Sequence, residues 1–273
     1  MNKQIVVVGS LNMDMVVQVE RRPGVGETIM GSRFFTSPGG KGANQAYAAA
    51  RLGGTVCMAG RVGADMFGET LLRHLREAGV QTDGIAVCKD ESSGVACITV
   101  DAQGDNSIIV APGANQRITA EDIRRIEPQI RSAALLVVQL EIPPDAVAEA
   151  IRMAHRSRVP VLLDPAPARP LPDELLGMVD YITPNETEIF HLTGINVGDP
   201  ESAFRAGEAL LSRGVKNVLA KLGENGVAVA GAAERFHLPG FRVNAVDTTA
   251  AGDTFAGALA VALTEGTPLK EAV

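Results

Sequence analysis

The stretch IVVVG at residues 5–9 is apolar at every position up to its glycine. A short, unbroken apolar run of this kind is typical of a strand that is buried on both faces of a sheet. Similar runs recur along the chain as LLVVQL (135–140), VPVLLD (159–164), YIT (181–183) and VLAKLG (218–223). The sequence therefore predicts a buried, mostly parallel sheet.

Helical patterns with recognisable ends lie between these runs. One follows Asp65, with apolar residues at helical spacing up to a stop at Gly79. Another begins at the pair Asp199–Pro200, which is typical of an N-cap and first turn, and ends at Gly214. This alternation predicts an α/β protein with a three-layer, Rossmann-like fold, in which helices flank a mostly parallel sheet.

Two stretches interrupt the alternation. Residues 12–36 and 94–111 have the alternating pattern of short strands joined by glycine-containing turns. We expect them to form a small antiparallel β lid at the edge of the α/β body, which then comprises residues 1–11, 37–93 and 112–273. Because ligands of open α/β sheets bind beyond the carboxyl ends of the strands, such a lid could cover a site.

Composition narrows the possible functions. A net charge of −7 over 273 residues argues against binding to nucleic acid or to an acidic membrane, since both require a basic face. The three cysteines lack CxxC spacing and the four histidines are scattered, so neither a disulfide framework nor a zinc site is expected. No apolar run has the length of a signal peptide or a membrane span. We therefore expect a soluble, cytoplasmic protein.

Two polar clusters lie at expected helix starts. SPGGKGANQA (37–46) has glycines that permit close backbone approach and polar side chains that can donate, but a flexible turn before an alanine-rich helix would look the same. In TPNETE (183–188), Asn185 and Glu188 are three residues apart and can face one direction, as the partners of a capping box also do. Neither cluster alone decides between a binding site and a structural role.

The most informative stretch is TTAAGDTFAGALAVAL (248–263), where small residues lead into an apolar helix that contains one acid, Asp253. The backbone N–H groups of residues 250–252 and the helix dipole would point toward a bound anion. Asp253 would repel a resting anion there, but it could deprotonate a hydroxyl while the N–H groups stabilise a transferring phosphoryl group. An aspartate that merely caps the helix is the alternative.

Together these clusters resemble the ribokinase-like sugar kinase family, of the phosphofructokinase B type. GGKGANQA matches the first signature of the family, DTTAAGDTFAGA matches the second, and PNETE matches the NxxE element between them. The stretches GSLNMD (9–14), QLEIP (139–143), DPAPA (164–168) and PGFRVNAVDT (239–248) are also similar, so the resemblance covers essentially the whole chain. It implies ATP-dependent phosphorylation of a sugar, with the 5-hydroxyl of D-ribose as the expected acceptor.

The resemblance also implies roles for residues that match the family motifs. Asp253 would be the general base, and the backbone of Ala250, Ala251 and Gly252 would form an anion hole. Sugar hydroxyls would be bound by Asn12, Asp14, Gly40, Lys41, Asn44 and Glu141. Asn185 and Glu188 would organise the phosphates of ATP and Mg²⁺, the metal through water; Lys221, Gly223 and Gly226 would lie beside the nucleotide; and Asp247 and Thr249 would help to hold K⁺.

The sequence departs from the family pattern at its end. The chain stops at GTPLKEAV (266–273), before the helix, small-residue stretch and glycine-containing turn that complete the adenine pocket and the cation site in the family. A truncated chain, an incomplete gene product and a genuinely short relative all fit this end. We expect such a chain to bind ribose better than ATP and to respond weakly to K⁺.

Alternatives to a ribose kinase stay open at this point. Another sugar, such as deoxyribose or fructose, could be the substrate, because Asn12, Asp14 and Glu141 suit any polyhydroxylated ring. The chain could also be a catalytically impaired sugar-binding form, or a nucleotide-binding α/β protein of unrelated chemistry. Because the apolar faces and edges of the lid segments need cover, we further expect two lids to pair in a homodimer.

Overall fold

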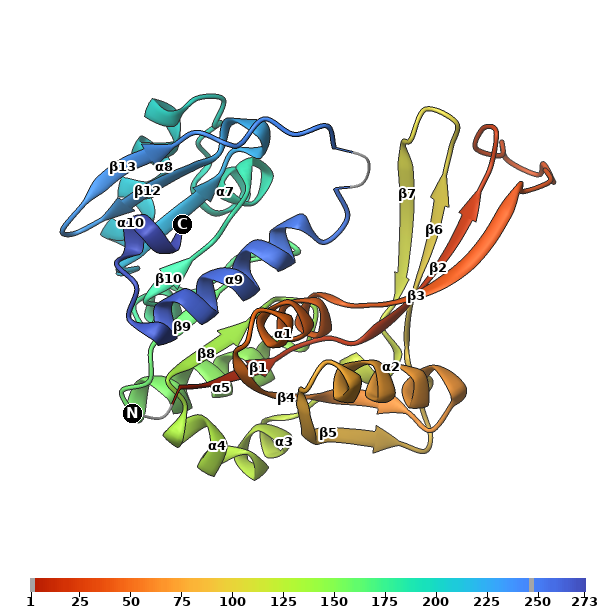
Figure 1. Cartoon of the computed structure of the whole chain (residues 1–273), viewed down its shortest axis with the longest axis horizontal. Coiled ribbons are helices and arrows are strands. Elements are labelled where there is room, and N and C mark those ends of the chain that lie inside the picture. The colour runs from red at the N-terminus through yellow and green to blue at the C-terminus, as the bar shows by residue number, and fades with distance from the viewer. Residues whose placement is uncertain (1–2, 246–247) are drawn as a thin grey trace.

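The structure is a computed structural model that describes residues 3–245 and 248–273. Its central feature, within these residues, is a nine-stranded sheet (Figure 1). The strand order is β13 (Arg235–Leu238), β12 (Val227–Gly231), β11 (Asn217–Lys221), β10 (Tyr181–Ile182), β9 (Val161–Leu163), β8 (Leu135–Val138), β1 (Gln4–Val8), β4 (Thr55–Gly63) and β5 (Gln81–Cys88). All neighbours from β11 to β5 run parallel, while β12 and β13 extend one edge in antiparallel fashion.

Helices cover both faces of this sheet. One face carries α1 (Lys41–Arg51), α2 (Met66–Glu77), α9 (Ala251–Glu265) and α10 (Leu269–Ala272). The other carries α3 (Ala120–Arg125), α4 (Glu127–Ser132), α5 (Pro144–Arg156), α6 (Asp173–Leu176), α7 (Glu186–Thr193) and α8 (Pro200–Ser212). The strand β1 shows why both layers form, because Ile5 and Val7 pack with the first set of helices and Val6 and Val8 with the second. The predicted three-layer α/β fold is therefore confirmed.

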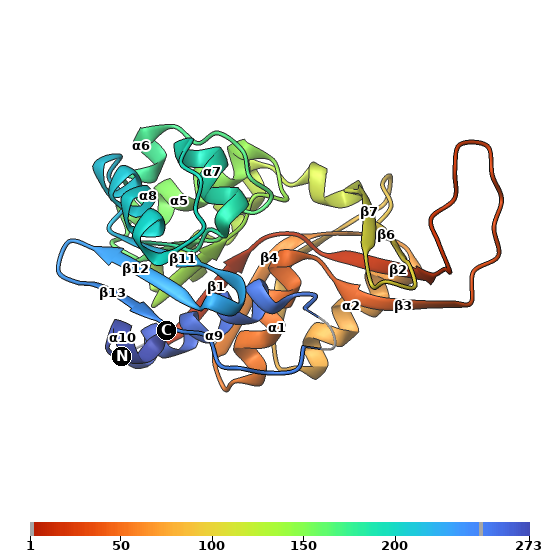
Figure 2. The same cartoon turned by 90° about the horizontal axis from the view of Figure 1, so that it is seen from above.

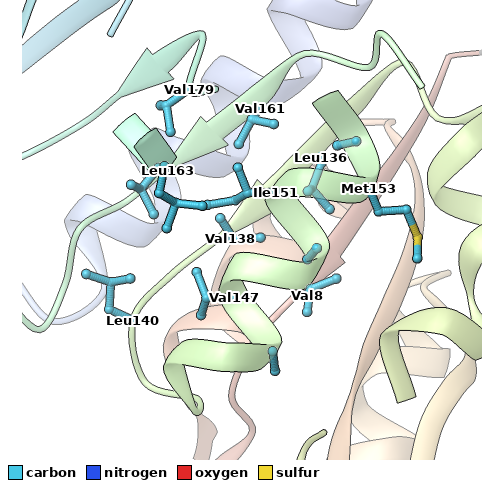
Figure 3. Packing of buried hydrophobic residues seen from close by; sticks show 14 of the residues in the cluster. Val8, Leu136, Val138, Leu140, Val147, Ile151, Met153, Val161, Leu163 and Val179 are labelled. Carbon is cyan, nitrogen blue, oxygen red and sulfur yellow. The ribbon is translucent and has the colours of Figure 1, made fainter. Parts of the chain in front are cut away.

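Figure 3 shows the second of these cores at close range. Val8, Leu136 and Val138 project from neighbouring parallel strands toward Val147 and Ile151 of α5, and all five side chains are at most 1% exposed. Such burial on both faces explains why the strands read as unbroken apolar runs in the sequence.

The predicted helix ends are also confirmed. The side chain of Asp65 accepts a hydrogen bond from the N–H of Gly68 at the start of α2, and Asp199 forms a capping box with Ser202 at the start of α8. Both glycine stops have a positive φ, 89° at Gly79 and 102° at Gly214, which a residue with a side chain rarely adopts.

The strands β4 and β5 were not among the apolar runs predicted from the sequence. In β4 the run is interrupted by Gly60 and Arg61, and the Arg61 guanidinium forms two hydrogen bonds with Asp122 of α3, at 2.8 and 3.1 Å. Arg61 interrupts the apolar run that would mark a buried strand. Its partner Asp122 lies far away in the sequence, so the sequence alone does not show that Arg61 can be accommodated in the strand.

A separate small sheet stands away from the body of the molecule (Figure 1). Its order is β3 (Arg33–Gly39), β2 (Asn12–Gln18), β6 (Gly94–Val100) and β7 (Asn106–Ala111). The pairs β2–β3 and β6–β7 are antiparallel, while β2 and β6 run parallel between them. The strand β3 continues to Gly39, three residues beyond the boundary expected at residue 36. Figure 2 shows the connection between β2 and β3 extending far from the body.

The small sheet is joined to the body at a buried amide, Asn115, in the 3-10 turn η1 (Gly113–Arg117). Its side chain accepts from the N–H of Leu11 at 2.9 Å and donates to the carbonyl of Leu11 at 3.0 Å and to Oδ1 of Asn12 at 2.8 Å. These bonds fix the first residue of β2 relative to the body.

Among the helices that the structure describes, none is long and apolar enough to cross a membrane.

The helices α1 and α9 make a close contact that depends on a glycine. A Cβ atom on Gly257 would lie 2.8 Å from the carbonyl oxygen of Gln45 and 3.0 Å from the backbone nitrogen of Ala49. These distances are shorter than normal contacts, and backbone atoms of a helix cannot move aside cheaply. Gly257 therefore sets the spacing of the two helices.

We expect Gly257→Ala to lower the free energy of unfolding by about 1–2 kcal/mol, because overpacking of about 1–3 kcal/mol outweighs the gain of up to ~1 kcal/mol in helix propensity. Urea denaturation measures the change. Gly198→Ala is the matched control, since a Cβ there meets no atom within 4 Å. Equal stability of the two variants would show that the helices are not in tight contact.

Candidate active site

Asp253 lies in the first turn of α9 and is only 6% exposed. Its two carboxylate oxygens accept hydrogen bonds from side chains of α1, Oδ2 from Nδ2 of Asn44 at 3.0 Å and Oδ1 from Nε2 of Gln45 at 3.1 Å. The N-cap position of α9 is occupied by Ala250 and has no side-chain capping bond. The structure thus shows Asp253 bonded to a neighbouring helix and not acting as a cap of its own.

The environment of Asp253 opposes its ionised form. Burial raises the pKa of Asp253, and the carboxylate of Asp164 raises it further, while Lys41 and the amides of Asn44 and Gln45 act in the opposite direction. The net effect is a pKa above the usual value of 3.8. A carboxylate with a raised pKa accepts a proton more readily, which suits a general base.

The start of α9 gathers groups that attract an anion. The first-turn N–H groups of a helix have no acceptor within the helix, and Gly252 and Asp253 are in that turn. Lys221 adds a positive charge, because its Nζ atom lies 3.2 Å from the position that a Cβ on Gly252 would take. Among the expected anion-hole residues, the N–H of Ala251 donates to the carbonyl of Thr248 at 3.2 Å.

A cavity of about 220 Å³ lies between α1, α2 and the start of α9. Its lining includes Asn44 and Ala250, together with Tyr47 and His74, whose rings are stacked with their centroids 4.4 Å apart. Asp14 is not among its lining residues, so this cavity adjoins the acidic side chains of the site without containing them.

A second group of polar side chains lies where the small sheet meets the body. The carboxylate of Glu141 accepts from Oγ of Ser10 at 2.6 Å and from the backbone N–H of Lys41 at 3.2 Å. Asp14 projects from β2 beside Gly39, where a Cβ would collide with its carboxylate. Burial, followed by repulsion from Glu141 and Asp253, raises the pKa of Asp14 to about 6. These carboxylates are therefore close enough to interact electrostatically across the site.

Lys41 lies among the acids of the site. Burial lowers the pKa of its ammonium group, but attraction to Asp253, Glu141, Asp164 and Glu188 outweighs burial and the pKa is raised. The backbone turn before it requires glycine, because Gly40 has φ +91° and a Cβ there would lie 2.6 Å from the backbone nitrogen of Asn12. The fold thus brings together the predicted residues Asn12, Asp14, Gly40, Lys41, Asn44, Glu141 and Asp253.

The predicted pair Asn185 and Glu188 forms a capping box at the start of α7. The N–H of Asn185 donates to Glu188 at 2.8 Å, and the N–H of Glu188 donates to Asn185 at 2.8 Å. Glu188 is nevertheless buried, which raises its pKa. The capping box considered as the structural alternative is therefore present. Glu188 also lies close enough to Lys221 and Lys41 for their charges to oppose the rise of its pKa.

Lys221 ends β11 beside this capping box. Its backbone N–H donates to the carbonyl of Pro184 at 2.8 Å, and its Nζ pairs with Asp164 at 3.0 Å. The expected nucleotide segment continues through Gly223, in the 3-10 turn η2 (Gly223–Asn225), to Gly226. Gly226 has φ +87° and approaches the carbonyl of Leu238 too closely for any side chain.

The expected K⁺ ligands are only partly placed. Thr249 lies in the turn before α9, and Asp247 lies outside the described residues. Within residues 3–245 and 248–273, no group of three or more His, Cys, Asp or Glu side chains is arranged to hold a metal ion directly.

The structure adds residues that the sequence argument did not assign. Gln45 is fully buried and donates hydrogen bonds to Asp164 and Asp253. Ser10 donates to Glu141, and Asn115 donates to Asn12. Gln45 and Asp164 lie inside the motifs GGKGANQA and DPAPA, so the motifs gave their position but not their contacts.

Comparisons with known proteins bear on the family and the fold of this chain. A family model described as pfkB family carbohydrate kinase matches residues 2–273. The chain is 41% identical over 273 residues to a ribokinase of Haemophilus influenzae, which covers 100% of this chain and 89% of the relative. It is 39% identical over 257 residues to a deoxyribokinase of Salmonella typhi, covering 94% of this chain and 84% of the relative.

A solved structure of Arabidopsis thaliana ribokinase complexed with ribose and ATP has the same fold. Its TM-score is 0.91 at 36% identity, over 100% of this chain and 89% of that one. Sequence signatures, fold and full-length similarity therefore point in one direction. The chain belongs to the pfkB family of carbohydrate kinases.

Proposed function

We propose that this protein transfers the γ-phosphoryl group of ATP to the 5-hydroxyl of D-ribose, with Asp253 as the general base. The observation that carries the proposal is the buried carboxylate of Asp253, held by Asn44 and Gln45 at a helix start beside Lys41 and Asp14. Its closest support outside the site is the full-length similarity to proteins named ribokinase.

The sugar would bind where the small sheet meets the body. Carboxylates accept hydrogen bonds from hydroxyl groups, which suits Asp14 and Glu141, while Lys41 and Asn44 are donors. Asn115 fixes the orientation of the Asn12 amide by donating to its Oδ1, and we expect the NH₂ group of Asn12 to donate to a hydroxyl oxygen. The absence of a side chain at Gly40 lets the start of α1 pack against the backbone of Leu11 and Asn12, which brings the groups of α1 and β2 close together. Donors and acceptors together fit a polyhydroxylated ring.

The phosphate groups would lie at the start of α9. Asp253 takes the proton of the 5-hydroxyl as its oxygen bonds to the γ-phosphorus and the bond to the leaving ADP breaks. The backbone N–H groups of Ala250 and Gly252 and the ammonium of Lys221 would stabilise the negative charge of the transferring group. The N–H of Ala251 would join them only after its hydrogen bond to the carbonyl of Thr248 opens. Gly223 and Gly226 would lie beside the nucleotide.

The donor set also fits the expected cations. Burial disfavours the charge of Glu188, and a nearby divalent cation would offset that cost, so Glu188 and Asn185 would hold Mg²⁺ through water. When bound, Mg²⁺ neutralises phosphate charge. We assign K⁺ to Thr249 and Asp247 on their positions in the sequence alone.

A cytoplasmic location fits the three cysteines, Cys57, Cys88 and Cys97, which are all free thiols.

A coupled ADP-release assay with ribose, deoxyribose and fructose, with and without K⁺, tests this proposal. We expect the highest kcat/KM with ribose; a preference for deoxyribose would instead match the relatives named deoxyribokinase.

Asp253→Asn should keep the fold and bind ribose, but lose turnover by roughly two to four decades, the range typical of a positioned base. Glu265→Gln, at the exposed end of the same helix, is the matched control. Near-normal turnover of Asp253→Asn would refute the base assignment.

Asp14 predicts a specific pH dependence. Because the ionised carboxylate is the stronger acceptor and protonation turns one of its oxygens into a donor, ribose affinity should fall as the pH drops through about 6, the folded pKa of Asp14. The folded pKa is above the usual 3.8, so the contribution of Asp14 to stability is present below that value and is lost as the pH rises through about 6. Asp14→Asn should therefore raise Tm more at pH 7.5 than at pH 4.5, while weakening ribose binding.

Calorimetric titration with ribose and thermal unfolding at both pH values measure these effects. Asp83→Asn, at an exposed position on β5, is the control and should change neither. A pH-independent ribose affinity in the native protein would exclude ionised Asp14 as a sugar ligand.

We also propose that two copies pair through their small sheets. The pairing register places Ile108 and Val110 on the face that carries Asp14, and Phe34 and Ile109 on the opposite face. These four side chains are 47–74% exposed, and such apolar area is typical of an interaction surface.

Light scattering at micromolar concentration should give the mass of a dimer. Ile108→Asp and Ile109→Asp change opposite faces of the small sheet. Only the variant on the face that the dimer buries should be a monomer, which identifies that face. A native protein that is monomeric, or two variants that both remain dimers, would contradict pairing through this sheet.

A further inference from the structure

Behind Asp253 lies a pair of buried amide side chains, Gln45 on α1 and Gln139 just after β8. Both are 0% exposed. The NH₂ group of Gln45 donates to Oδ1 of Asp253 at 3.1 Å and to Oδ2 of Asp164 at 2.9 Å. Its carbonyl oxygen accepts from Nε2 of Gln139 at 2.6 Å. One amide therefore bridges two carboxylates and is itself held by a second amide.

The chemistry of the groups fixes the orientation of both amides. Two ionised carboxylates are acceptors only, so Gln45 must turn its NH₂ group toward Asp164 and Asp253. Its oxygen then faces Gln139, which must present its own NH₂ group. A flip of either amide would set oxygen against oxygen. The hydrogen bonds therefore form one chain, in which Gln139 donates to Gln45 and Gln45 donates to the two carboxylates.

This arrangement leaves one buried oxygen atom without a hydrogen bond. The oxygen of Gln139 is buried and has no hydrogen-bond partner among the residues that the structure describes. A side chain at Gly9 would collide with that oxygen, so the glycine makes room for it. Leaving a buried acceptor unpaired costs stability, and a native structure that keeps one needs a reason.

The reason lies in the charges that surround Asp253. Asp164 is bound on its other oxygen by Lys221 at 3.0 Å, and Asp14 and Lys41 also act on Asp253 electrostatically. Without a shared donor, the carboxylates of Asp164 and Asp253 would repel each other. Gln45 gives both a hydrogen bond and leaves Oδ2 of Asp253 with Asn44, toward the sugar side.

We propose that Gln45 is a positioning residue for the general base, which fixes the rotamer of Asp253 and favours its ionised form, and that Gln139 fixes the orientation of Gln45. This inference rests on the proposed role of Asp253. Neither amide touches the reacting atoms. Both act through the carboxylate.

The test compares Gln45→Leu with the native protein in steady-state kinetics from pH 5.5 to 9. Loss of the donor lets the carboxylate turn and makes its ionisation harder, because burial and Asp164 already raise the pKa of Asp253. We expect kcat to fall by roughly tenfold to hundredfold at pH 7, the scale of a misplaced catalytic group. The acidic limb of the kcat profile should move to higher pH, so the deficit shrinks as the pH rises, while ribose affinity changes less than about threefold.

Two further variants keep the inference testable if Gln45→Leu folds poorly. Gln139→Met leaves the donor in place but frees its orientation, so it should give a smaller loss of kcat and a shift of the acidic limb in the same direction. Gln129→Met is the matched control, because Gln129 is the other amide with a buried, unpartnered oxygen in the described chain and it lies on α4. It should leave kcat and its pH profile unchanged.

The outcomes separate this inference from the proposed function. If Asp253→Asn is inactive while folded Gln45→Leu and Gln139→Met show native kcat and an unmoved acidic limb, the positioning role is wrong and the base stands. If Asp253→Asn itself turns over normally, the proposed base is wrong. A lower Tm with an unmoved pH profile would reduce Gln45 to a structural residue and overturn the inference.

Discussion

The close contact between α1 and α9 is the constraint on which the site depends. Gly257 allows the backbone of α9 to approach that of α1, and one turn earlier on the same helix Asp253 meets Asn44 and Gln45. A wider spacing would separate the carboxylate from both amides by more than hydrogen-bond distance. Helix packing therefore sets the geometry of the base, because backbone contacts are stiffer than any side-chain rotamer.

Charge balance is the second condition for this site. Asp253, Asp164, Asp14 and Glu188 are gathered in a region where burial disfavours ionised groups. Two ammonium groups, of Lys41 and Lys221, offset part of this cost. The balance stays unfavourable for Asp253, Asp14 and Glu188, whose pKa values are raised. A bound hydroxyl group or cation would offset part of that cost.

The small sheet is attached to the body by few but specific contacts. Asn115 ties the backbone of Leu11 and the side chain of Asn12 to the body, and all three hydrogen bonds are buried. The sheet itself keeps large apolar side chains exposed on both faces. The first residue of β2 is thus held in a fixed place beside the acids, while the exposed apolar side chains of the sheet can contact another surface.

The amino-acid sequence determined the layers of the fold and the positions of most site residues. Apolar runs such as residues 5–9 are legible because burial on both faces removes every polar position, and helix ends at Asp65 and Gly214 depend on local capping alone. Asp253 was recognisable because small residues surround it. These signals need no long-range information.

Only the tertiary structure decided what those residues contact. Gln45 and Asp253 are separated by 208 positions and Gln45 and Asp164 by 119, so no local spacing reveals their shared hydrogen bonds. The same limit hid β4, whose Arg61 is paired with a helix residue 61 positions away. Patterns of period 2 or 3.6 report which face of an element is buried, but the identity of a partner across the core is set by packing.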